Sequence, residues 1–343
     1  MKKSYIYIIG IIFLSGIVFG FYLYNALYAP NIKTTKKAFV DVPQKATFQD
    51  LEKILSPYFI SQRRFELASK LKRFSKAKPG RYQLTDKMSN NDLINQLRIG
   101  NQVEIKVTFN NQNSLEDLAT AISKQIAPSK EELLHVMQDQ TFLNENGFSK
   151  ETALLMYLPD TYRMYYNTTA KQFRAKMLQQ FRKFWNSDRV HLAKKQNLSP
   201  LQVGILASII QKESTKQSEL PRIAGVYLNR LKAHMLLQAD PTVVYAYKQK
   251  YGKDLVIKRV LNKHKAVDSP YNTYKYAGLP PGPICMPDKQ SINAVLHPEQ
   301  HKFYYFVADF DKPGYHIFSK SLGEHNRHAS NYHSALNRQK IFH

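Results

Sequence analysis

Cysteine is almost absent from this chain, which removes several kinds of structure from consideration. Cys285 is the single cysteine among 343 residues, so no intramolecular disulfide can form, and the redox character of the compartment stays open. The spacing of a zinc finger, an RNP-like motif and a basic helix followed by heptads are also missing. The sequence therefore gives no sign of a nucleic-acid-binding module, and packing is the simplest role for Cys285.

Acidic residues are scarce relative to basic ones. The chain has 50 Lys and Arg against 26 Asp and Glu, which gives a formal net charge of +24. Such a surplus suits an anionic partner, whether nucleic acid, phospholipid headgroups or an acidic polymer. Because the basic residues are spread along the chain, the pattern favours general attraction to an anionic surface.

Charge is missing altogether between Lys3 and Lys33. Tyr5 to Tyr24 is almost wholly apolar, and about 20 such residues at a rise of ~1.5 Å span a hydrocarbon core of ~30 Å. A cleaved signal peptide has a shorter apolar region, of about 7–15 residues. The pattern predicts an uncleaved transmembrane anchor at residues 5–28.

The flanks of this anchor do not fix its orientation, because lysines stand on both sides of it. In the simpler topology, residues 1–4 form a short cytoplasmic tail and everything beyond the anchor is exported. Residues 29–40 have the composition of a polar linker.

Residues 41–108 have the pattern of a small module built from strands and helices. Thr47 is placed to cap one helix, Ser89 and Asp92 have the form of a capping box for another, and Val103 to Phe109 alternates as a strand. The strand–helix–helix–strand order suggests a binding module, and a plain spacer is the alternative.

Glu213 ends the most informative stretch of the chain. Ser199 followed by Pro200 predicts a helix start, and apolar residues then recur at three- and four-residue spacing up to three residues before Glu213. A carboxyl group that continues an apolar stripe is partly desolvated, which raises its pKa and suits a general acid near neutral pH. The alternative is a structural glutamate that bends into water or pairs with Lys212 or Arg222.

Two loops rich in proline and tyrosine follow, at residues 268–274 and 278–284. Aromatic faces can pack on sugar rings, while amides and hydroxyls bond sugar hydroxyls. The candidate sugar-binding residues on this reasoning are Gln238, Tyr271, Asn272, Thr273 and Tyr274.

Two other constellations compete with a site built on one carboxylate. Four histidines could hold a metal: His316, His325, His328 and His333. Because no H-E-x-x-H pattern and no cysteine pair accompany them, we expect no metal site. Asp240 could be the second carboxylate of a glycosidase, although a residue directly before a proline at a helix start is more simply a cap.

Several separated motifs occur in an ordered series after the anchor. They are Leu158–Tyr162, Ile205–Glu213, Val226–Arg230, Leu237–Thr242, Ser269–Tyr274, Gly278–Ile284 and Glu324–Asn326. In this order they resemble the endolytic murein transglycosylase family (MltG, YceG-like), over nearly the whole exported part. Where such relatives have a second glutamate, this chain has Gln211, and where they read Ile-Pro-Glu-Gly it has Phe109 to Gln112.

The resemblance implies an α+β fold with an N-terminal transmembrane helix. A LysM-like module at residues 41–108 would follow, and a mixed α+β catalytic domain at residues 109–343. The catalytic glutamate of the family corresponds to Glu213. Four residues inside the matching motifs join the candidates for substrate binding: Asp240, Thr242, His325 and Asn326.

The resemblance also implies a reaction. The MurNAc-β-1,4-GlcNAc bond of nascent glycan strands would be cleaved without water, leaving 1,6-anhydro-MurNAc ends and terminating strand elongation. Glu213 would protonate the glycosidic oxygen and then take the proton of the muramyl C6 hydroxyl, so neither a cofactor nor a second carboxylate is required. The alternative is a non-catalytic, membrane-anchored scaffold that binds peptidoglycan.

The same reading sets the expected partners and location. The partners are peptidoglycan strands, the lipid bilayer around residues 5–28 and, as candidates, peptidoglycan synthases, with no nucleic acid. The location is the bacterial cytoplasmic membrane in a single pass, with the catalytic domain outside, and periplasmic where an outer membrane exists.

Overall fold

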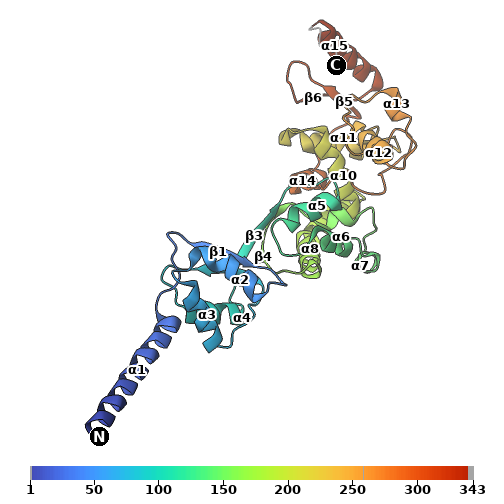
Figure 1. The fold of residues 1–343 in the computed structure, drawn as a ribbon. Coiled ribbons are helices and arrows are strands. Elements are labelled where there is room, and N and C mark those ends of the chain that lie inside the picture. Colours follow the sequence, from blue (N-terminus) through green and yellow to red (C-terminus); the bar gives the residue numbers. More distant parts are fainter. Residues whose placement is uncertain (1, 258, 339–343) are drawn as a thin grey trace. The chain divides into compact units, whose positions relative to one another are not determined.

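Helices make up most of the described chain, and the strands in that part pair into three two-stranded sheets, β1–β2, β3–β4 and β5–β6 (Figure 1). The computed structural model describes residues 2–257 and 259–338. The fold is therefore of the α+β class that the sequence predicts. The chain divides into two compact units, the first made of residues 1–107, 122–129 and 161–169, and the second of residues 108–121, 130–160 and 170–343.

The first unit begins with a long apolar helix, α1 (Lys2–Tyr28). It is followed by β1 (Ala38–Val42), α2 (Phe48–Leu55), the short 3₁₀ helix η1 (Ser56–Tyr58), α3 (Gln62–Leu71), β2 (Gly80–Leu84) and α4 (Asn90–Ile99). β1 and β2 are antiparallel, with Val40 opposite Tyr82, and the helices pack with this pair of strands around a core that includes Phe65 and Leu93. The predicted caps are confirmed, since Thr47 forms a capping box at α2 and Ser89 accepts a bond from the Asp92 amide at α4.

The segment before β1 differs from the polar linker that its composition suggests. Ile32 is fully buried, and Asn31 donates to the Asn90 side chain at 2.8 Å. The Ile32 carbonyl also accepts a bond from the amide of Lys87. The buried Ile32 side chain and the bonded Asn31 amide hold the segment on the folded unit. A mostly polar composition does not reveal such contacts, because they involve only two residues.

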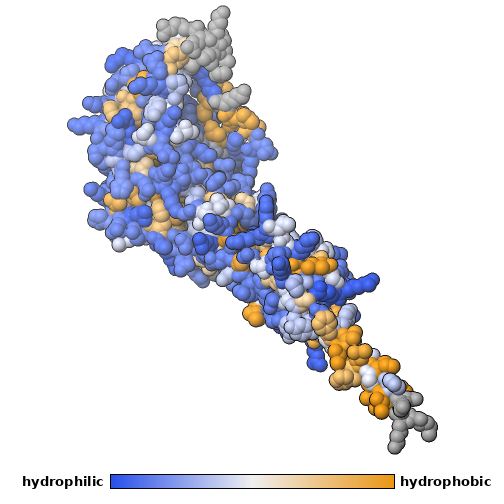
Figure 2. All heavy atoms as spheres, turned by 90° about the vertical axis from the view of Figure 1, so that its left-hand side faces the viewer, coloured by the Kyte–Doolittle hydropathy of each residue, from blue (hydrophilic) through white to orange (hydrophobic). Residues whose placement is uncertain are grey.

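Helix α1 is the one helix in the described chain that is long and apolar enough to cross a membrane. Within its stretch Tyr5–Tyr28, a window of 18 residues has a mean hydropathy of 2.4, and none of that window is buried. Figure 2 shows its side chains as a hydrophobic surface. Its C-terminal end is fixed by side chains of the same unit: Arg64 donates to the Asn25 carbonyl and Asn90 to the Ala26 carbonyl, each at 2.8 Å.

The chain continues through β3 (Glu104–Phe109), which pairs with β4 (Asp160–Tyr165). The remaining elements up to the site are α5 (Leu115–Ser123), α6 (Lys130–Met137), α7 (Gln140–Glu145), η2 (Ala153–Met156), α8 (Ala170–Phe184) and α9 (Ser187–Lys195). Those after them are α10 (Pro200–Glu213), η3 (Gln217–Glu219), α11 (Leu220–Lys232), α12 (Asp240–Tyr251), α13 (Asn262–Lys265), α14 (Lys289–Leu296), β5 (Tyr305–Ala308), β6 (His316–Ser319) and α15 (Leu322–Arg338). β5 and β6 form an antiparallel hairpin, in which Phe306 lies opposite Phe318.

Helix α10 lies at the centre of the second unit. Every residue from Val203 to Ile210 is buried, and the helix packs against α9, α11, α12 and α14. A helix buried on all sides over two turns is held rigidly, because each of its side chains is in close-packed contact. Its last residue, Glu213, is therefore presented from a fixed support.

Candidate active site

Glu213 is the C-terminal residue of α10, as the sequence predicts. Ser199 caps the other end through its hydroxyl oxygen, which accepts the Gln202 amide at 3.2 Å, and Pro200 occupies the first turn. The helix leaves the core at Glu213, which is partly exposed and lines an open groove. The structure thus confirms the helix and places its carboxyl group at a surface that a ligand can reach.

The carboxyl group of Glu213 is bonded to a buried tyrosine. Tyr227 of α11 is 2% exposed, and its hydroxyl donates to Oε1 of Glu213 at 2.6 Å. Burial raises the pKa of Glu213 to about 7, against the bond from Tyr227, and the negative charge of Asp240 adds to the rise. Near neutral pH both forms of Glu213 are populated, which suits a group that first gives and then takes a proton.

Lys212 and Arg222, the two basic residues that could pair with Glu213, are bonded to other groups. Arg222 pairs with Glu299, its Nε lying 2.9 Å from Oε2. The ammonium group of Lys212 donates to the Asn113 side chain at 3.3 Å. Neither basic residue is the hydrogen-bond partner that the structure assigns to Glu213.

The groove has a volume of about 1010 Å³ and is lined from several elements. Helix α12 presents Asp240, Val244 and Lys248, which share a face at four-residue spacing. The basic residues along the groove are Lys212, Lys248, Lys253, Arg259 and Lys265. Its acidic residues are Glu213, Asp117, Asp240 and Asp254, so a wall of mixed charge surrounds one carboxyl group of raised pKa.

Asp240 is not the helix cap that its place before a proline suggests. The N-cap of α12 is Ala239, without a side-chain bond, and Asp240 is already inside the helix. Its carboxylate instead accepts the hydroxyl of Tyr274 at 2.6 Å. Asp240 lines the groove together with Glu213, and its negative charge raises the pKa of Glu213.

Three of the predicted sugar-binding residues are buried among protein partners: Thr242, Asn272 and Thr273. The hydroxyls of Thr242 and Thr273 lie 2.8 Å apart, and Asn272 donates to the Val267 carbonyl at 2.7 Å. The Gln238 side chain is exposed, its backbone φ is 50°, and its backbone N–H donates to the Thr273 carbonyl at 3.0 Å. Direct contact of these residues with sugar stays a prediction, and their bonds show that they fix the loop bearing Tyr274.

The other predicted residues do not line the groove as the structure describes it. Tyr271 packs on Tyr245 with ring centroids 4.8 Å apart, while the His325 ring stacks on Tyr305 at 5.4 Å and Asn326 is exposed. Of the nine substrate-binding candidates, Asp240 alone lines the described groove beside Glu213. The role of the others in substrate binding stays a prediction.

The histidines have separate partners in this structure. His316 is bonded to Glu219, and His328 to the Ser319 hydroxyl at 3.0 Å. The side chain of His333 is outside the described part. Among the described residues, no three histidine, cysteine, aspartate or glutamate side chains gather in a way that could hold a metal ion.

Sequence reasoning missed Tyr227 and Arg230 as parts of the site. Both lie in the motif Val226–Arg230 at helical spacing, but a tyrosine on a buried face is more simply core. Arg230 is 7% exposed and donates to the carbonyls of Tyr304 and Leu237 at 2.6 and 2.7 Å. Its positive charge lowers the pKa of Glu213 slightly against the larger effect of burial.

Gln211 and Cys285 are structural. The Gln211 side-chain oxygen accepts the Asp288 amide at 2.6 Å, which ties the 285–288 segment to α10. Cys285 is fully buried, as its expected packing role requires, and burial raises the pKa of its thiol to about 11. Neither group can serve as a nucleophile or a base at neutral pH.

A single carboxyl group of raised pKa, bonded to a buried tyrosine in a polar groove, is the arrangement of a general acid–base site. The sequence profile of the YceG-like family matches residues 40–331, so the chain belongs to the YceG-like family. The resemblance drawn from the motifs is thereby confirmed.

Individual relatives agree with this assignment. The endolytic murein transglycosylase of Bacillus subtilis (strain 168) is 31% identical over 341 residues, covering 94% of this chain and 92% of that protein. The endolytic murein transglycosylase of Streptococcus pneumoniae serotype 2 is 27% identical over 354 residues, and the match spans 64% of its length. A crystal structure of a YceG-like protein from Listeria monocytogenes matches 86% of this chain and 99% of that chain, with a TM-score of 0.56 at 29% identity.

Proposed function

We propose that this protein is an endolytic peptidoglycan lytic transglycosylase, with Glu213 as its catalytic residue. The observation that carries the proposal is the partly exposed carboxyl group of Glu213, whose pKa burial raises to about 7 and which lines an open groove of about 1010 Å³. The names of the relatives from Bacillus and Streptococcus supply the substrate, a glycan of the cell wall.

The reaction needs one group that acts twice. Protonated Glu213 gives its proton to the oxygen of the MurNAc–GlcNAc bond as that bond breaks. The resulting carboxylate then takes the proton of the muramyl C6 hydroxyl, whose oxygen attacks the anomeric carbon of the same sugar and closes the 1,6-anhydro ring. Water does not take part, and Glu213 regains its proton at the end.

Tyr227 fits both halves of this cycle. Its hydroxyl donates to Glu213, so it stabilises the carboxylate that forms after the first transfer. General acid–base catalysis contributes about 10²–10⁴-fold, or roughly 3–5 kcal/mol. The rest must come from distortion of the sugar ring and from stabilisation of positive charge at the anomeric carbon, and Asp240 lies in the same groove with a negative charge.

The basic residues of the groove suit the peptide branches of the substrate. These branches carry carboxylates, and Lys248 is partly buried along the groove on the same helix face as Asp240. The two residues are eight positions apart, or about 12 Å along the helix axis. An extended peptide of about four residues covers that distance, so a branch attached near Glu213 reaches Lys248.

The remaining parts of the chain fit a protein of the cell surface. Helix α1 would anchor the protein in the cytoplasmic membrane in one pass, with residues 1–4 on the cytoplasmic side and the rest outside. The first unit would be a LysM-like module that binds glycan, and peptidoglycan synthases are candidate partners. By acting on nascent strands the enzyme would terminate their elongation.

Analysis of the product ends tests this proposal. The protein without α1 should convert purified peptidoglycan into fragments with 1,6-anhydro-muramyl ends, seen by mass spectrometry as products lacking one water. Glu213→Gln should abolish them, while Glu299→Gln, which removes a partly exposed carboxylate of the same domain, should not. Reducing ends from the wild-type protein would replace the proposal by a hydrolase.

A non-catalytic scaffold is not favoured by this site. Binding alone does not need a carboxyl group that is half-ionised at neutral pH and bonded to a buried tyrosine. A scaffold predicts that peptidoglycan binding survives Glu213→Gln and that no product forms with either protein. The same digestion distinguishes the two functions.

A further inference from the structure

The β5–β6 hairpin is connected to the candidate catalytic residue, Glu213, through intervening residues along two separate routes. The first passes through an aromatic ring. Phe306 of β5 packs edge-on against Tyr227, with ring centroids 5.9 Å apart at an angle of 90°. Tyr227 in turn donates its hydroxyl to Glu213, so the ring of Phe306 fixes the position of the donor.

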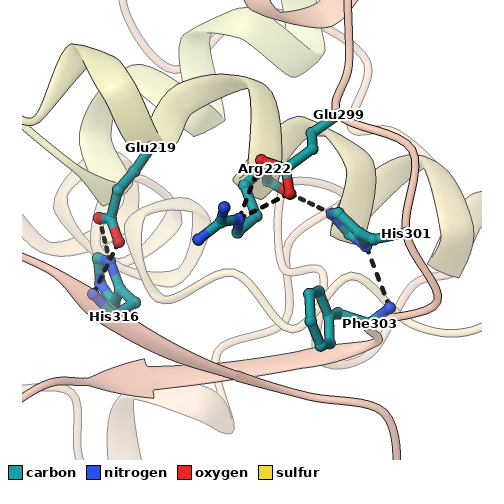
Figure 3. A network of polar contacts seen from close by, with 6 residues as sticks. All are labelled: Glu219, Arg222, Glu299, His301, Phe303 and His316. Carbon is teal, nitrogen blue, oxygen red and sulfur yellow. Dashed lines mark hydrogen bonds and ion pairs between the residues drawn. The ribbon is translucent and has the colours of Figure 1, made fainter.

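The second route passes through the hydrogen-bonded pair of Glu219 and His316 (Figure 3). Glu219 is 5% exposed, and its two carboxylate oxygens each lie 2.9 Å from a nitrogen of His316 on β6, one from the backbone amide and one from the ring Nδ1. Ser214 donates its hydroxyl to the same carboxylate at 3.4 Å. Ser214 directly follows Glu213, and its amide bonds the Ile210 carbonyl at the end of α10.

The two routes meet again inside the hairpin. The rings of Phe306 and His316 are in edge-to-face contact, with centroids 5.1 Å apart. Contacts therefore form a closed circuit from Glu213 through Tyr227, Phe306, His316, Glu219 and Ser214 back to Glu213. A circuit of this kind fixes both the backbone and the carboxyl group of the residue that it contains.

We propose that the β5–β6 hairpin is a positioning element for Glu213, and that Ser214, Glu219, Phe306 and His316 are positioning residues of the reaction. This inference rests on the proposed function of Glu213. A glutamate in the last turn of a helix needs such support, because the final carbonyls lack partners within the helix and the end frays easily. Proton transfer is sensitive to this, since a displacement of about 1 Å can cost ~10²-fold in rate.

A neighbouring ion pair provides the contrast. Arg222 on α11 binds Glu299 with Nε 2.9 Å from Oε2, and His301 next to it contacts the Arg222 carbonyl at 2.9 Å (Figure 3). This pair also joins α11 to the segment that leads into β5, but it is partly exposed and does not touch Ser214 or Tyr227. The Arg222–Glu299 pair therefore joins α11 to the same region of the chain but does not belong to the series of contacts that returns to Glu213.

Ser214→Ala and Phe306→Leu test the proposal. Each should lower kcat by about 10-fold or more, towards the ~10²-fold cost of a displacement of about 1 Å, while KM stays within a factor of about two. Ser214→Thr, which keeps the hydroxyl, should retain most of the rate, and Glu299→Gln should leave kcat unchanged. A role in general stability would lower the melting temperature of all four variants without separating kcat from KM. If Ser214→Ala and Phe306→Leu keep the wild-type kcat, the hairpin does not position Glu213.

A structural measurement makes the result independent of the type of reaction. Crystal structures of Ser214→Ala and Phe306→Leu should show Glu213 displaced from Tyr227, lengthening the bond of 2.6 Å. An unchanged bond in both variants would overturn the inference, even if the wild-type protein proved to be a hydrolase or inactive. Failure of the proposed function would appear instead in the products of the wild-type digestion.

Discussion

Replacing Tyr227 by phenylalanine removes one oxygen and one hydrogen bond from the candidate site. That bond, 2.6 Å long, favours the ionised form of Glu213, so its loss raises the pKa of Glu213 further above about 7. A hydrogen bond to a charged group is worth about 1.5–3 kcal/mol. Since one pKa unit corresponds to about 1.4 kcal/mol, the pKa of Glu213 should rise by about 1–2 units.

The assay is the pH dependence of kcat/KM on soluble glycan strands, measured from the anhydro ends formed. The alkaline limb reports loss of the protonated acid in the free enzyme, and it should move from about pH 7 in the wild type to about pH 8–9 in Tyr227→Phe. Below the limb, kcat should fall, because the carboxylate that forms after the first proton transfer has lost its donor.

Tyr276→Phe is the matched control for this experiment. Tyr276 is exposed and donates to the Asp268 carboxylate at 2.8 Å, so the same chemical change is made outside the groove around Glu213. Its alkaline limb should coincide with that of the wild type. The reasoning is refuted if the limb of Tyr227→Phe stays in place or moves to lower pH.

Three further predictions concern the groove and its loop. The pKa of Glu213 in the folded protein, about 7, lies above its ordinary value of 4.5, so the ionisation of Glu213 lowers folding stability as pH rises between these values. Glu213→Gln should therefore raise the melting temperature more at pH 8 than at pH 4. An equal change at the two pH values would contradict this prediction. Lys248→Gln should raise KM about 2–5-fold for strands with carboxylate-bearing peptides, the effect of one ion pair screened by solvent in an open groove, and should not change KM for amidated strands or for either substrate at high salt. Asn272→Ala should lower the free energy of unfolding by about 1–3 kcal/mol for each buried partner left unpaired, measured in urea, whereas the exposed Asn326→Ala should have no effect.

The local features of the fold could be predicted from the sequence because they depend on neighbouring residues. The cap at Ser199, the proline at the first turn and the apolar spacing up to Ile210 are sufficient to predict α10, and alternation is sufficient to predict β3. The segment around Ile32 could not be placed in this way, because its burial depends on contacts with residues more than 25 positions away.

The sequence was sufficient to single out Glu213 but not the residues that bond and position it. Glu213 could be singled out because its position relative to the apolar stripe is a local property. Its partner Tyr227 is 14 residues away on another helix, and Glu219 and His316 are 97 residues apart, so only the fold brings them together. The predicted polar residues Thr242 and Asn272 show the converse, since a residue type suited to sugars equally suits a loop that must satisfy its own backbone.

The bonds from Arg64 and Asn90 to the end of α1 have a consequence for how the protein sits in a bilayer. A free transmembrane helix adapts to membrane thickness by sliding or tilting, at a cost of fractions of a kcal/mol per Å. Here the carbonyls of Asn25 and Ala26 are held by a folded unit, so the helix cannot slide without lifting or submerging that unit. In the anchored protein that we propose, the first unit thus limits how deeply α1 inserts into the bilayer, and the thickness of the membrane determines how far from its surface the first unit lies.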